Sequence, residues 1–256
     1  MREPQGSSRA ATTVRDGVRA AAAADLRQRA RSVLKADSAF AKCSDVVIDE
    51  MMARAVVVRL AKGETMYRQG EPGDNLMVVL SGSLKVVNIT AEAKEVVIAF
   101  LAAGALIGEI AVLDGHPRTA GVVAMEPVEA VALYRRDLMP ILRANPDALL
   151  ALLEATCARL RTTIALVESY GLETEARVAA GLLRLAGEHG RETGRETTIE
   201  LKLNQRDLGS HLGLTRETIS RTLGDFRSAG LIELRGAVIV ILDLEGLGVL
   251  AEGGGD

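Results

Sequence analysis

The chain has 256 residues, 48% of them hydrophobic and 25% charged, and its 31 basic and 34 acidic residues give a net charge of −3. This composition excludes a disordered or collagen-like chain, and no apolar stretch reaches the length of a membrane span. The charge excludes a uniformly basic protein that coats nucleic acid, while the length is sufficient for two domains.

The two cysteines, Cys43 and Cys157, lie far apart and lack the spacing of metal ligands. They favour a reducing, cytoplasmic environment and predict no metal site, no iron–sulfur cluster and no disulfide framework. Cys157 is expected to be a buried, inert thiol. The three histidines, His116, His189 and His211, do not indicate a pocket with an axial haem ligand, so no haem is expected.

Residues 1–35 are predicted to be a disordered or partly helical N-terminal extension. Small residues at 6–8 and an alanine run at 20–24 show no packing period, whereas hydrophobic residues from Leu26 onward recur at helical spacing. A transit peptide is a less favoured alternative, because the alanine run lacks the amphipathic face that such peptides need.

Residues 36–145 are predicted to form an antiparallel sandwich, a jelly roll or a barrel. Short β-branched runs are separated at regular intervals by turns that contain glycine. These runs are residues 56–58, 76–80, 84–87, 96–100, 122–123 and 128–133.

Residues 146–172 are predicted to be one long helix followed by a hinge. Pro146 is tolerated at the first helical position, Asn145 can cap the helix, and Gly171 ends it. The apolar face follows alternating gaps of four and three residues, the 3.5-residue period of a coiled coil. Its members are Leu149, Leu153, Thr156, Leu160, Thr163, Val167 and Tyr170. A homodimer is therefore favoured over the alternative, a helix that packs only on its own domain.

Residues 173–250 are predicted to contain a helix over 174–187, a strand over 197–203, a helix-turn-helix and a hairpin around 235–236. Gly213 permits the tight turn between the two helices, and Thr215 can cap the second. The outward face of the second helix carries Arg216, Glu217, Ser220 and Arg221. A recognition helix presents such side chains to the major groove, where arginine suits guanine and glutamate can accept from cytosine. The alternative is a solvated charged face.

Residues 107–120 predict an anion site. Gly108 leads into a short helical turn that contains Glu109 and Ile110, so backbone N–H groups at its start can hold an anion. Arg118 adds a fork of donors that matches phosphate geometry, and Thr119 adds a hydroxyl. Since Glu109 is an acceptor suited to a ribose hydroxyl, the set indicates a sugar phosphate.

These segments carry a resemblance to a known family. The segment Lys62–Asp74, followed by Leu80–Leu84, resembles the cyclic-nucleotide-binding β-roll, and residues 108–120 look like its phosphate-binding cassette. Over roughly residues 40–244 the chain resembles the catabolite activator and fumarate-nitrate regulator (CRP/FNR) family of transcription regulators. Its Arg-Glu-Thr-x-x-Arg sequence at residues 216–221 is similar to the recognition helix of cyclic-AMP-binding members.

The resemblance implies an α+β fold with a cyclic-nucleotide-binding β-roll over 36–145, a dimerisation helix and hinge over 146–172, and a winged helix-turn-helix over 173–250. It implies a homodimeric, cytoplasmic transcription regulator that is not an enzyme and is not associated with a membrane. The expected partners are a palindromic site in double-stranded DNA and RNA polymerase. The expected effector is cyclic AMP, with cyclic GMP as the alternative.

By the same resemblance, the cassette residues receive individual roles. Glu109 would hold the ribose 2′-hydroxyl, Arg118 the phosphate, and Thr119 the phosphate or the base. Arg159 of the long helix would pair with Glu109.

The base is expected to meet the long helix at Thr163, with Thr162 as the alternative in a shifted register. Ile164 stands where cyclic-AMP sensors of the family carry a serine, which weakens the case for cyclic AMP. Two rival functions remain open: a family member that binds DNA without a ligand or with another effector, and a cyclic-nucleotide regulatory subunit of a partner enzyme. The helix-turn-helix and the single cassette count against the second.

Overall fold

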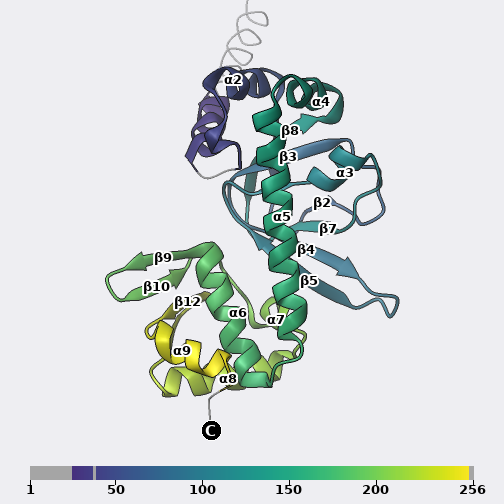
Figure 1. Ribbon diagram of the computed structural model, residues 1–256. Coiled ribbons are helices and arrows are strands. Elements are labelled where there is room, and N and C mark those ends of the chain that lie inside the picture. Colours follow the sequence, from purple (N-terminus) through teal and green to yellow (C-terminus); the bar gives the residue numbers. More distant parts are fainter. Residues whose placement is uncertain (1–24, 37–38, 254–256) are drawn as a thin grey trace, which may run out of the picture.

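The computed structural model describes residues 25–36 and 39–253, which form an N-terminal and a C-terminal lobe joined by the long helix α5 (Figure 1). The helices after residues 25–36 are η1 (Ala39–Lys42), α2 (Asp45–Arg54), α3 (Glu109–Asp114), α4 (Arg135–Ala144), α5 (Pro146–Ser169), α6 (Thr174–His189), α7 (Gln205–Leu212), α8 (Arg216–Ser228) and α9 (Leu244–Ala251). The strands are β1 (Val56–Leu60), β2 (Thr65–Tyr67), β3 (Asn75–Ser81), β4 (Leu84–Ile89), β5 (Glu95–Leu101), β6 (Leu106–Ile107), β7 (Gly121–Ala124), β8 (Val128–Tyr134), β9 (Gly190–Thr193), β10 (Glu196–Ile199), β11 (Ile232–Arg235) and β12 (Val238–Ile241).

The predicted antiparallel β-domain is a roll of two four-stranded sheets. Their strand orders are β1-β8-β3-β6 and β2-β7-β4-β5, and every pairing is antiparallel. Buried side chains from both sheets, including Leu84, Val79 and Ala130, fill the space between them. The six predicted runs are all strands, while β2 and β6 were missed because three and two residues are too few to show a period.

The start of the described chain belongs to the N-terminal lobe. Residues 25–36 are helical, and Leu26, Ala30 and Leu34 are buried in a core shared with α2, α4, β3 and the start of α5. The expected helical spacing from Leu26 is therefore confirmed, and residues 25–35 pack with the roll. The disorder and transit-peptide hypotheses concern residues 1–24, which lie outside the described residues.

Helix α5 has the predicted length but not the predicted cap. Asn145 occupies the N-cap position, yet its side chain does not cap the helix, because its amide nitrogen donates to the carbonyl oxygen of Ile141 at 2.8 Å. In the single chain, Leu149, Leu153 and Val167 are 40%, 51% and 60% exposed. This face of α5 thus carries large apolar side chains that the chain itself leaves uncovered.

The C-terminal lobe contains the predicted helix-turn-helix, α7 and α8. Gly213 adopts the left-handed conformation at the turn, and the Thr215 side chain accepts a hydrogen bond from the backbone N–H of Thr218, so the predicted turn and cap are confirmed. The hairpin β11–β12 follows, in a sheet of order β11-β12-β10-β9. The strand expected over 197–203 ends at Ile199, and α6 continues two residues past its predicted end to His189. None of the described helices is long and apolar enough to cross a membrane.

Candidate functional site

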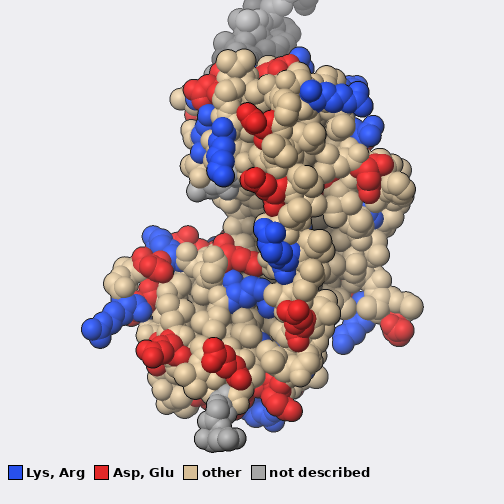
Figure 2. All heavy atoms as spheres, in the orientation of Figure 1, with Lys and Arg blue, Asp and Glu red and all other residues tan. Residues whose placement is uncertain are grey.

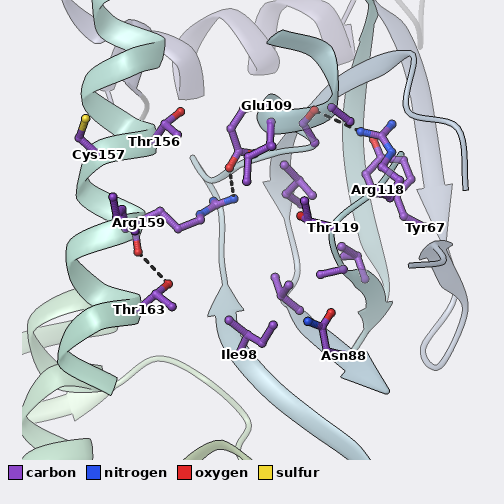
Figure 3. A pocket seen from close by; sticks show the side chains of 18 residues that line it. Tyr67, Asn88, Ile98, Glu109, Arg118, Thr119, Thr156, Cys157, Arg159 and Thr163 are labelled. Carbon is purple, nitrogen blue, oxygen red and sulfur yellow. Dashed lines mark hydrogen bonds and ion pairs between the residues drawn. The ribbon is translucent and has the colours of Figure 1, made fainter. Parts of the chain in front are cut away.

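A cavity of about 360 Å³ lies between the roll and α5 (Figure 3). This volume falls within the range of about 300–1,000 Å³ that is usual for small-molecule sites. Its walls come from β2, β4, β5, β6, β7, α3, the segment 118–120 and α5. The lining residues are Tyr67, Val86, Asn88, Ile98, Ile107, Gly108, Glu109, Ile110, Ala111, Arg118, Thr119, Ala120, Val122, Thr156, Cys157, Arg159, Leu160 and Thr163.

Arg118 is a buried cation in this wall, only 5% exposed. Its two terminal nitrogens donate to carbonyl oxygens, Nη1 to Gly108 at 3.2 Å and Nη2 to Asn75 at 2.9 Å, and its guanidinium carbon lies 3.7 Å from the centre of the Tyr67 ring. Its Nε has no hydrogen-bond partner. Within the described ranges, no carboxylate forms an ion pair with Arg118. A buried cation whose hydrogen bonds and ring contact are all to neutral groups favours the arrival of an anion.

Gly108 makes room for this guanidinium. Its φ of +87° is left-handed, and a Cβ atom there would lie 2.2 Å from Nη1 of Arg118 and 2.8 Å from the carbonyl oxygen of Asn75. A side chain at this position would therefore displace Arg118 and strain the entry into α3.

Unlike Arg118, Glu109 has a partner of opposite charge among the described residues. Its Oε1 lies 2.8 Å from Nη1 of Arg159, whose Nη2 donates to the carbonyl oxygen of Leu106 at 2.6 Å. The pairing expected from the resemblance is therefore present, and it joins the cassette directly to α5. Glu109 is 3% exposed, so a ribose hydroxyl would share this carboxylate with Arg159.

The remaining expected ligand residues divide between the cavity and the space outside it. Ile110, Thr119 and Thr163 line the cavity, and the Thr163 hydroxyl donates to the carbonyl oxygen of Arg159 at 2.9 Å, within its own helix. Thr162 is not part of the lining; it interacts with Glu188 of α6. Burial raises the pKa of that carboxyl, and the Arg184 cation and the Thr162 side chain partly oppose the rise. The register that uses Thr163 is thus the one that faces the cavity.

Three further residues, which were not expected from the sequence, project into the cavity: Tyr67 from β2, Asn88 from β4 and Ile98 from β5 (Figure 3). Tyr67 lies in a strand too short to be recognised, and the other two occupy recognised strands whose cavity-facing side depends on how the roll closes. Cys157 is among the residues that line the cavity, and it is exposed in the single chain, which therefore does not bury it as expected.

A second concave surface lies at the helix-turn-helix. It is lined by all four predicted DNA-reading residues, Arg216, Glu217, Ser220 and Arg221, together with Gln205. The opposite face of α8 is held in the core by Ile219, Leu223 and Phe226. Gln205, the first residue of α7, was missed because only the fold places it beside α8. Over the face shown in Figure 2, basic and acidic side chains are interspersed.

The candidate ligands for metals or haem are scattered. Within the described residues there is no group of three histidine, cysteine or acidic side chains that could hold a metal ion. His116 is exposed in a loop, whereas His189 and His211 lie between the two lobes, where both are hydrogen-bonded to backbone carbonyl groups.

Comparison with known proteins defines the class of protein. Residues 57–145 match the family model of the cyclic nucleotide-binding domain, and residues 176–250 match that of the Crp-like helix-turn-helix domain. A cyclic-nucleotide-binding roll followed by a Crp-like helix-turn-helix is the organisation of a CRP-like transcription regulator.

The chain belongs to the CRP/FNR family of transcription regulators, which are not enzymes. It is 30% identical over 191 residues to the CRP-like cAMP-activated global transcriptional regulator of Mycobacterium tuberculosis, and the match covers 74% of this chain and 85% of that protein. Among solved structures, FixK2 from Bradyrhizobium japonicum matches with a TM-score of 0.68 at 23% identity, over 77% of this chain and 96% of that one. The c-di-GMP responsive global regulator CLP of Xanthomonas campestris matches with a TM-score of 0.64 at 22% identity, over 77% and 99%. These two likenesses show the shared fold.

Proposed function

We propose that this chain is a homodimeric, cytoplasmic transcription regulator whose binding to palindromic DNA is controlled by a cyclic nucleotide, cyclic AMP in the first place and cyclic GMP as the alternative. Its functional units would be the roll with its preceding helices up to residue 145, the dimerisation helix and hinge over 146–172, and the winged helix-turn-helix over 173–250. RNA polymerase would be its partner at the promoter.

The observation that carries this proposal is the state of Arg118. A permanent cation is buried in a cavity wall, and among the residues that the structure describes it has no carboxylate ion-pair partner and no hydrogen bond at Nε. The cyclic phosphate of a nucleotide would supply the missing anion, next to Gly108 and the exposed Thr119. The ribose would then meet Glu109, and the base would extend toward Leu160 and Thr163 on α5.

The choice of cyclic AMP is supported by the M. tuberculosis relative, which is a cAMP-activated regulator. Ile164, at the position where a serine is expected, and the c-di-GMP response of the structurally similar CLP support testing other nucleotides beside it. All of these cyclic nucleotides carry a phosphate that the Arg118 guanidinium could bind.

The uncovered apolar face of α5 supports a dimer. Leu149, Leu153, Leu160 and Val167 recur at coiled-coil spacing, and each is at least 40% exposed in the single chain. Two such helices side by side would bury these residues and place two recognition helices on one face. A palindrome with half-site centres about 34 Å apart is the expected target.

Coupling between the two sites would run through α5. This one helix lines the cavity at Leu160 and Thr163, carries the proposed dimer face, and ends at the hinge before α6. The hinge is tied to the C-terminal lobe, because Arg177 of α6 donates to the carbonyl oxygens of Tyr170 at 2.6 Å and of Leu172 at 2.8 Å. A nucleotide that changes the packing of α5 would therefore move α8.

The test is calorimetry of the full chain with cyclic AMP, cyclic GMP and cyclic di-GMP, followed by selection of bound sites from random DNA with and without the nucleotide that binds. We expect saturable binding of one cyclic mononucleotide and recovery of a palindrome in its presence. If none of the three nucleotides binds while a palindrome is recovered, the chain is a ligand-independent regulator or responds to another effector. If a nucleotide binds but no DNA sequence is enriched, the chain regulates a partner in another way.

A further inference from the structure

The two lobes of a single chain meet along the outer edge of β5. This strand is last in the sheet β2-β7-β4-β5, so one row of its backbone N–H and C=O groups has no neighbouring strand. Side chains of the C-terminal lobe bind several of these groups. The contact is separate from both the nucleotide cavity and the concave surface of α8.

Ser210 and His211 of α7 make the central bonds. The Ser210 hydroxyl donates to the carbonyl oxygen of Glu95 at 2.7 Å and accepts from the backbone N–H of Val97 at 3.2 Å. Nδ1 of His211 lies 3.1 Å from the carbonyl oxygen of Val97, and its ring packs edge-on against Phe100 with the centroids 5.1 Å apart. Helix α7 thus satisfies both backbone groups of Val97, as a neighbouring strand would.

Two further contacts flank this pair. Nζ of Lys85 on β4 lies 2.9 Å from the carboxylate of Asp207 on α7, and the two side chains are only 15% and 11% exposed. Nε2 of His189, at the end of α6, lies 3.1 Å from the carbonyl oxygen of Phe100. Because these groups are shielded from water, the docking is more specific than a contact between exposed charges.

The same strand also forms part of the cavity wall. Ile98 lines the cavity, and the adjacent Val97 is the residue that α7 binds. A ligand that shifts β5 would therefore reach the helix-turn-helix within one subunit, without passing through α5 or the partner subunit.

We infer that Ser210 and His211 are positioning residues for DNA recognition, which fix the orientation of α8 on the roll by bonding to the edge of β5. The DNA readout of this inference rests on the proposed function; the docking itself does not. In the docked orientation Arg216, Glu217 and Arg221 stay exposed, so this orientation leaves the DNA-reading face free. A palindrome needs both recognition helices at one spacing, so loosening the docking would weaken its binding.

The docking requires a neutral His211 ring. Nη2 of Arg184 lies 3.3 Å from Nε2 of His211 and can only donate, so Nε2 accepts and Nδ1 carries the proton that is donated to Val97. The charged and titratable groups around this ring are Arg184, Glu188 and His189 of α6, Tyr170 at the end of α5, Lys85 of β4, Glu95 of β5 and Asp207 of α7. A protonated ring would lose its acceptor and face the Arg184 cation, so acid would release the docking.

The first test compares Ser210→Ala with the wild type on a full palindrome and on a single half-site, by equilibrium binding of the full chain. We expect affinity for the palindrome to fall by about threefold to tenfold for each hydrogen bond lost, and affinity for the half-site to stay unchanged because the helix-turn-helix is intact. Ser228→Ala, an exposed serine on α8, is the control. Equal changes on both DNAs, or no change on either, would overturn the inference.

The second test needs neither DNA nor nucleotide, so its failure is distinct from failure of the proposed function. Dyes on cysteines introduced at Val46 and Arg227 in a Cys157→Ser background report the distance between the lobes by energy transfer, with labelled chains diluted into unlabelled ones. Between about pH 7.5 and about pH 4, from above the usual histidine pKa of about 6.5 down to the lowered pKa of the docked His211 ring, the wild type should change its transfer efficiency. His211→Asn, which keeps a donor for Val97 but does not titrate, should stay at the neutral-pH value. His116→Gln should behave as the wild type, and a His211→Asn profile like the wild type would overturn the role of His211.

Discussion

Arg118 and Glu109 are the two buried charges of the cavity, and they are compensated in different ways. Glu109 has the Arg159 guanidinium at 2.8 Å, whereas Arg118 has carbonyl oxygens, one side-chain amide and the face of an aromatic ring. Neutral acceptors return less of the desolvation energy of a cation than a carboxylate does. Of the two charges, Arg118 therefore has more to gain from a bound phosphate.

Replacing Arg118 with Ala should weaken cyclic-nucleotide binding by about 10- to 100-fold, because a charge-assisted contact in a partly dry site is lost. Calorimetry of the variant gives the affinity, and circular dichroism shows that the roll remains folded. Arg68→Ala is the matched control, since Arg68 is an exposed arginine on the adjacent loop that pairs with Glu71. Unchanged affinity in the Arg118 variant would remove this side chain from the site.

The neighbouring threonines of α5 give a second comparison between matched residues. Thr163 lines the cavity, whereas Thr162 interacts with Glu188. Thr163→Val should lower nucleotide affinity by about threefold to tenfold through the loss of one hydroxyl, and Thr162→Val should leave it unchanged. Titration of both variants under the same conditions decides between the two registers; a loss that follows Thr162 instead would mean that α5 rotates when the ligand binds.

At the scale of the element, α5 shows how far a periodic sequence predicts structure. The 3.5-residue period of the sequence predicted this helix and its exposed face. In the helix-turn-helix, Gly213 predicted the turn and Thr215 predicted the cap. The seam predicts an interface because Leu153 and its neighbours remain apolar where a single chain exposes them. A residue that lies on the seam but outside the cavity tests this interface separately from ligand binding.

Leu153→Glu should convert the proposed dimer to monomers at micromolar concentration, since a charge buried between two helices has no partner. Light scattering measures the mass. Arg161→Glu, an exposed change on the same helix and off the seam, should leave the mass unchanged. A wild-type protein that is already monomeric would contradict the coiled-coil interpretation.

Other elements could not be predicted, for reasons that are local in some cases and tertiary in others. Strands β2 and β6 are too short for a period, and Asn145 bonds back to Ile141 instead of capping α5. The cassette residues were identified from their chemistry, but the contribution of Asn88 and Gln205 to concave surfaces depends on how separate elements come together. The docking of α7 on β5 joins residues more than 100 positions apart, which no local pattern records.

At the scale of the whole molecule, the contact between the lobes buries histidines that must stay neutral. Burial lowers the pKa of His211 from 6.5 to about 4, and it also lowers the pKa of His189. Below about pH 6.5 these histidines bind protons in the unfolded chain but remain neutral in the folded chain. The stabilisation is therefore complete above that pH and is lost progressively as the pH falls toward 4.

The free energy of unfolding should thus fall by about 3 kcal/mol from His211 alone between about pH 7 and about pH 4, at about 1.4 kcal/mol for each unit of pKa difference. Urea unfolding across this range measures the loss. Because exposed carboxylates contribute as well, the informative quantity is the difference between wild type and His211→Asn, which should narrow as the pH falls. Parallel profiles of the two proteins would mean that His211 titrates in the same way in both states.

One consequence of α5 concerns its rotational phase. At 3.6 residues per turn, each residue turns the helix by about 100°, and the faces that carry Thr163 and Val167 are aligned only through an unbroken count of residues. A single alanine inserted between them would leave both the cavity and the C-terminal lobe intact as folded units. It would rotate one against the other by about a quarter of a turn and would part α7 from the edge of β5, so that an effector could still bind while the two recognition helices lost their common spacing. The length of α5, as much as its side chains, therefore encodes communication between the two lobes.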